Sequence, residues 1–110
     1  MEKAPKPPKT YEAFVQRYPQ LGQAWELMRE AERSGPFDEK TSRLLKLAVA
    51  VGSQKEGPVH SSVRKALAAG ISRDEIEQVV AIAASTIGLP PTVSIFSWVL
   101  DELDGRERKG

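Results

Sequence analysis

Apolar residues recur at helical spacing along most of the chain, and polar breaks divide them into six segments. The residues expected to open, cap or precede these segments are, in order, Thr10, Pro19, Asp38, Pro58, Ser72 and the Gly88-Leu89-Pro90-Pro91 break. No segment alternates apolar and polar residues in the way of a half-buried strand bounded by hairpin turns. The pattern therefore predicts an all-α fold, a bundle of about six helices with short connections.

Two of these segments carry more specific signals. Ser72 is followed three residues later by Glu75, the spacing of a capping box at the start of a helix. The segment at residues 44–51 is apolar nearly all round. Such a helix needs cover on several sides.

Composition indicates one ordinary globular domain. The chain has 110 residues, of which 40% are hydrophobic and 28% charged, and a formal net charge of +1. This charge creates no general attraction to nucleic acid or to an acidic membrane, so we expect neither as a partner. The chain has no cysteine, which excludes disulfides, thiolate metal sites and thiol chemistry.

The two ends differ from the rest of the chain. Residues 1–9 contain three lysines and three prolines, which predicts an extended, flexible N-terminal arm. Residues 10–104 are expected to form the helical domain, and residues 105–110 a flexible tail. We find no apolar run of about 18–20 residues and no secretory signal, so the expected location is cytoplasmic and away from membranes.

Three pieces of the C-terminal 60% of the chain together resemble one protein family. The first is Thr41-Ser42-Arg43-Leu44-Leu45-Lys46-Leu47-Ala48-Val49, and the second is the stretch from Ser62 through the Ala69-Gly70 turn to Ile76. The third is the Gly88-Leu89-Pro90 break. In this order and at these separations they resemble the carboxymuconolactone decarboxylase family, which includes alkylhydroperoxidase D-like proteins.

The resemblance also shows what the chain lacks. In the redox branch of the family, a glutamate, two cysteines and a histidine form the peroxidase site. Ungapped alignment through the Ala-Gly turn puts these residues at Arg43, Lys55, Pro58 and Ser62. Proline is no nucleophile and arginine accepts no proton at neutral pH, so the usual thiol peroxidase chemistry is excluded. The decarboxylase branch needs no cysteine or cofactor, although it usually keeps a histidine where this chain has Ser62.

His60, the chain's single histidine, leads the candidate site residues. Glu56 lies four residues earlier, so the two form a candidate catalytic couple on one helix face, with His60 as general base. Arg43 would bind a carboxylate of the substrate, and Ser62 would donate a hydrogen bond to it. The simpler interpretation is that His60 is an exposed or capping residue on a solvated face.

Other kinds of site find little support in the sequence. One histidine with scattered carboxylates makes no zinc or iron site, and neither a phosphate loop nor a nucleophile elbow is present, so we expect no metal and no cofactor. The resemblance implies a homo-oligomer, commonly a trimer or hexamer, with the active cleft near a subunit boundary. Two functions stay open: a cofactor-free lyase or binder of a small carboxylated molecule, and an inactive homologue that serves as an assembly or interaction module.

Overall fold

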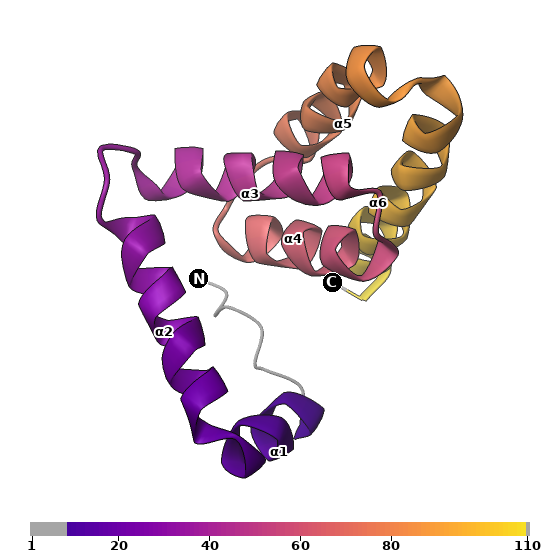
Figure 1. The fold of residues 1–110 in the computed structure, drawn as a ribbon. Coiled ribbons are helices and arrows are strands. Elements are labelled where there is room, and N and C mark those ends of the chain that lie inside the picture. The colour runs from indigo at the N-terminus through magenta and orange to yellow at the C-terminus, as the bar shows by residue number, and fades with distance from the viewer. Residues whose placement is uncertain (1–8, 110) are drawn as a thin grey trace.

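The computed structural model describes residues 9–109, with side chains up to residue 105, and it consists of six α-helices (Figure 1). Their bounds are α1 Lys9–Arg17, α2 Pro19–Arg33, α3 Glu39–Ser53, α4 Glu56–Ala68, α5 Arg73–Ile87 and α6 Leu89–Lys109. The described part of the chain has no strand. The predicted all-α fold is therefore confirmed.

Most helix ends follow the chemistry expected from the sequence. Asp38 caps α3 by accepting a 2.7 Å hydrogen bond from the Thr41 amide. Ser72 and Glu75 form the predicted capping box of α5, and Pro19 stands in the first turn of α2. Two starts differ from the predictions, since α1 begins at Lys9 rather than after Thr10 and α4 begins at Glu56, two residues before Pro58.

The ends of the chain are described only in part. Residues 1–8 of the predicted N-terminal arm lie outside the described residues. At the other end, α6 continues to Lys109 and so includes residues 105–109 of the predicted tail. The flexibility of that tail stays a prediction.

Helices α3 to α6 form a four-helix body around one apolar core. In this body α3 packs on α4 and α5, and α6 packs on α4 and α5. The core consists of Leu47, Ala50, Val51, Val59, Val63, Ala66, Ile71, Ile76, Val80, Ile95, Val99 and Leu103. Every one of these residues comes from α3 to α6 or from the connection before α5.

Helices α1 and α2 form an N-terminal helix pair that leaves the body at the start of α3 (Figure 1). The two helices pack on each other, and neither contains a buried residue. Gly22 permits their close approach, because a Cβ atom there would lie 3.3 Å from the Cβ of Val15. The pair gives the chain a radius of gyration of 14.9 Å, against about 13 Å for a compact domain of this length.

The expectation that residues 44–51 are covered on several sides is not met within one chain. Leu47, Ala50 and Val51 are buried, but Val49 is 73% exposed. Leu45, one turn before Val49, is also exposed. One face of α3 thus packs in the core, while the chain itself leaves the other apolar face open.

Candidate functional site

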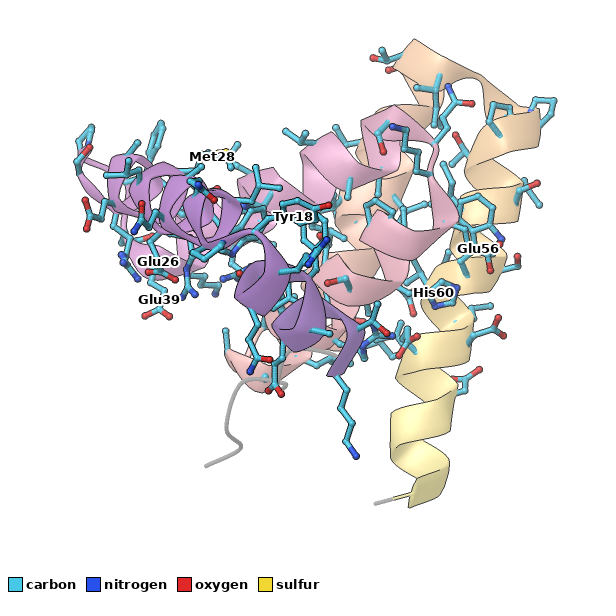
Figure 2. All side chains as sticks on the ribbon, turned by 60° about the horizontal axis from the view of Figure 1, so that its bottom comes forward. Tyr18, Glu26, Met28, Glu39, Glu56 and His60 are labelled. Atoms are coloured by element: carbon cyan, nitrogen blue, oxygen red, sulfur yellow. The ribbon has the colours of Figure 1, made fainter. Side chains whose placement is uncertain are left out.

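The early start of α4 places Glu56 and His60 one helical turn apart on the same face. Glu56 Oε2 lies 3.1 Å from His60 Nε2, and Figure 2 shows both residues beside α6. The predicted Glu56–His60 pair therefore forms. The side chain of His60 is only 19% exposed, so the histidine is not facing bulk solvent.

A second carboxylate, which the sequence analysis missed, completes the surroundings of His60. Glu102 of α6 brings Oε2 to 2.6 Å from His60 Nδ1, and its side chain is 18% exposed. Arg64, one turn after His60, donates from a terminal guanidinium nitrogen to the same oxygen at 2.9 Å. The four-residue spacing of Glu56, His60 and Arg64 could have predicted that Arg64 joins the pair. No local pattern could have predicted Glu102, because it lies 42 residues from His60 in the chain.

This cluster favours the charged form of His60. Burial alone would lower the pKa of His60, but the hydrogen bonds that its ring donates to Glu102 and Glu56 outweigh burial and raise that pKa above its usual value. Both ring nitrogens face carboxylates, and only the imidazolium ion can donate to both at once. An imidazolium has no lone pair with which to accept a proton, so this arrangement suits a charged link between helices better than a general base.

Arg43 and Ser62, the other two predicted site residues, do not join this cluster. No hydrogen bond within residues 9–105 connects either side chain to His60 or Glu56. Arg43 instead acts electrostatically on Lys65 and Glu32. The reason lies in the topology. Helices α3 and α4 are joined by a short turn and pack antiparallel, so the start of α3 lies beside the end of α4 (Figure 1).

Two grooves of the described surface lie away from these residues. One groove of about 700 Å³ runs between α5 and α6, and its apolar lining includes Val80, Leu89, Val93 and Phe96. Another of about 580 Å³ lies in the angle between α1 and α2. Neither groove is lined by Arg43, Glu56, His60 or Ser62.

Two kinds of feature are absent from the described residues. They include no group of three histidine, cysteine or acidic side chains placed to hold a metal ion. None of the helices within them has both the length and the apolar character for crossing a bilayer.

Comparison with protein families identifies the chain. The family model described as "Carboxymuconolactone decarboxylase family" matches residues 19–101, which is more than half of the chain and covers helices α2 to α5 and most of α6. Comparison with curated proteins and with solved structures found no match. The predicted resemblance is confirmed, and the chain is a cysteine-less member of the carboxymuconolactone decarboxylase family.

Proposed function

We propose that the chain is a subunit of a homo-oligomer and acts as an assembly or interaction module. The observation that carries this proposal is an apolar stripe on the N-terminal helix pair. The stripe is made of Phe14, Tyr18, Leu21, Trp25 and Met28, at three- and four-residue spacing. Each of these side chains is between 41% and 52% exposed.

A stripe of this kind needs a covering surface. Monomeric proteins rarely leave such continuous apolar patches in water. The four-helix body offers complementary surfaces, since Leu45 and Val49 of α3 and the groove between α5 and α6 are also apolar and exposed. Burial of the stripe of one copy on the body of the next would cover both surfaces, and repetition around a symmetry axis would close the assembly.

The other function considered, a cofactor-free lyase, finds less support in this geometry. It requires His60 to accept a proton beside a substrate held by Arg43. In the structure, both nitrogens of His60 face carboxylates, and Arg43 stands with Lys65 instead. Catalysis through His60 stays a prediction, and the pH experiment on His60 described in the Discussion bears on it.

The assembly is tested by the molar mass in solution. Light scattering coupled to size-exclusion chromatography should give the wild-type chain a small whole-number multiple of 12.1 kDa. Trp25→Asp places a charge in the stripe and should shift the protein toward the monomer, because the charge would be buried without a partner. Gln23→Asp, which adds the same charge on the opposite face of α2, should leave the mass unchanged. A wild-type mass of 12.1 kDa at all concentrations would contradict the proposal.

A further inference from the structure

The groove between α5 and α6 has one apolar end and one acidic end. At the apolar end its lining includes Leu89 and Val93, which are exposed side chains at the start of α6. At the other end the lining includes Asp74 and Glu77, at the start of α5. These starts lie at opposite ends of the groove because α5 and α6 pack on each other and are joined by a short turn (Figure 1).

The two carboxylates at the acidic end differ in their partners. Glu77 accepts a 2.8 Å hydrogen bond from Arg73, which also forms an ion pair with Asp104 at 3.0 Å. Asp74 is exposed, and within residues 9–105 its side chain takes part in no ion pair or hydrogen bond. Asp74 is therefore available to a cation from outside the chain.

The apolar stripe of the N-terminal helix pair carries the opposite charge at one end. The guanidinium carbon of Arg17 lies 5.9 Å from the centre of the Tyr18 ring. Within the described part of the chain, Arg17 forms no ion pair. Toward the other end of the stripe the chain balances its own charges, since Arg29 lies 3.8 Å from Glu26 and Glu32 pairs with a lysine of α3. Arg17 is thus the cation that the stripe can offer to a partner.

The stripe and the groove also match in length and in side-chain size. Residues 18–28 of the stripe and residues 74–84 of the groove wall each span about 15 Å of helix. When the charged ends of the two surfaces are placed together, Trp25 falls opposite Ala81. Met28 then falls opposite Ala84. Small side chains on one surface leave room for large ones on the other, so the two faces can interdigitate. Aromatic side chains contribute most to binding when they fill such pockets.

We propose that the groove between α5 and α6 is the docking site for the apolar stripe of a second copy of the chain, whose Arg17 pairs with Asp74. This inference rests on the proposed assembly and chooses the groove over the apolar face of α3. Leu45 and Val49 of that face line neither of the grooves described above, so they offer no recess for large aromatic side chains. The chain itself supplies both the groove with its anion and the stripe with its cation.

The dissociation constant of the assembly, from light scattering over a range of concentrations, tests the groove. Val93→Asp places a charge in the groove and should raise this constant by about tenfold or more, because the charge would be buried without a partner. Val49→Asp is the matched control, since it adds the same charge to the exposed face of α3, and it should assemble like the wild type. Circular dichroism should show that both variants are folded.

Charge reversal tests whether the stripe and the groove contact each other. Asp74→Arg and Arg17→Asp should each weaken the assembly by about tenfold, because each places two like charges together. The double variant restores the pair with its signs exchanged and should recover most of the wild-type affinity. A double variant that assembles no better than the single variants would overturn the pairing.

The outcomes separate this inference from the proposed assembly. A wild-type chain that stays monomeric refutes both. An oligomeric wild type that is dissociated by Val49→Asp but not by Val93→Asp overturns the groove as the docking site and leaves the assembly in place.

Discussion

His60 joins two helices that are far apart in the sequence. It belongs to α4, and its closest polar contact is the 2.6 Å approach of Nδ1 to Glu102 of α6. Arg64 reaches the same carboxylate from the next turn of α4. A partly buried carboxylate with two cationic neighbours is well compensated, so we interpret the cluster as a charged link between α4 and α6.

The stability supplied by this link should depend on pH. The pKa of His60 is raised in the folded chain above the value of 6.5 for an ordinary histidine. The stabilisation is therefore fully present below about pH 6.5 and is lost as the pH rises through the folded-state pKa. In urea denaturation between pH 5.5 and 9, His60→Gln should lower the free energy of unfolding by on the order of 1 kcal/mol at the acid end and by less at the alkaline end.

The opposite trend would assign a neutral histidine to the folded state. A loss of stability that grows toward pH 9 would mean that the neutral imidazole is the form that the fold favours. The general-base interpretation of His60 would then regain support, because a neutral ring has a lone pair for the proton. Glu56→Gln is a second variant for the same urea experiment. It removes the charge from only the longer of the two contacts of His60, at 3.1 Å, so it should lower the free energy of unfolding by less than His60→Gln does.

At this scale the sequence predicts local pairs and misses distant ones. The four-residue spacing of Glu56 and His60 was sufficient to predict their contact, because both lie on one helix face. Glu102 was missed because its approach depends on how α6 packs on α4. Arg43 was placed with His60 in the prediction, whereas the antiparallel course of α3 and α4 puts it near Lys65.

Among the helices, α5 has the most complete start. The Ser72 hydroxyl accepts a hydrogen bond from the Glu75 amide at 3.1 Å, and the Ser72 amide donates to the Glu75 carboxylate at the same distance. Lys40 of α3 forms an ion pair with this carboxylate at 2.6 Å. Hydrogen bonds from Lys40 and Ser72 lower the pKa of Glu75 to about 2, so the capping box stays ionised well into the acid range.

Removal of the cap should cost measurable stability. Ser72→Ala removes the acceptor for the Glu75 amide and should lower the free energy of unfolding by about 1 kcal/mol. Thermal or urea denaturation followed by circular dichroism measures this loss. Ser97→Ala is a suitable control, because the Ser97 hydroxyl donates only to the Ser94 carbonyl within an exposed turn of α6. Equal stability of Ser72→Ala and the wild type would mean that the capping box contributes nothing.

Helix positions could be predicted at this scale, but the partners of the helices could not. Apolar spacing identified all six segments, and the capping residues fixed the start of α3 and α5. The apolar stripe of α1 and α2 was also visible in the sequence. Periodicity shows that such a face needs cover, yet it contains no information on which surface provides the cover.

In the whole molecule, the core and the N-terminal helix pair are distinct parts. The core residues all belong to the four-helix body and the connection before α5, and the helix pair contributes none. The family match begins at residue 19, so it includes α2 but not α1. The family match therefore covers α2 and most of the four-helix body, while the cover of the apolar stripe depends on how the helix pair is held.

The weak attachment of the N-terminal helix pair has a consequence for local unfolding. Helices that bury no residue against a core open with a much smaller free energy than the core itself. In hydrogen–deuterium exchange, amides of α1 and α2 should therefore exchange well before those of α3 to α6 in a dilute sample.

If a second copy covers the stripe, this exchange becomes linked to protein concentration by mass action. Protection of α1 and α2 should then increase as the protein is concentrated, whereas protection of the four-helix body should change little. Exchange rates that are uniform across the chain at every concentration would show that the pair is part of a single cooperative unit. A concentration-dependent difference would instead mean that α1 and α2 reach their full stability only in the assembly, so that the concentration of the protein sets how well this end of the fold is held.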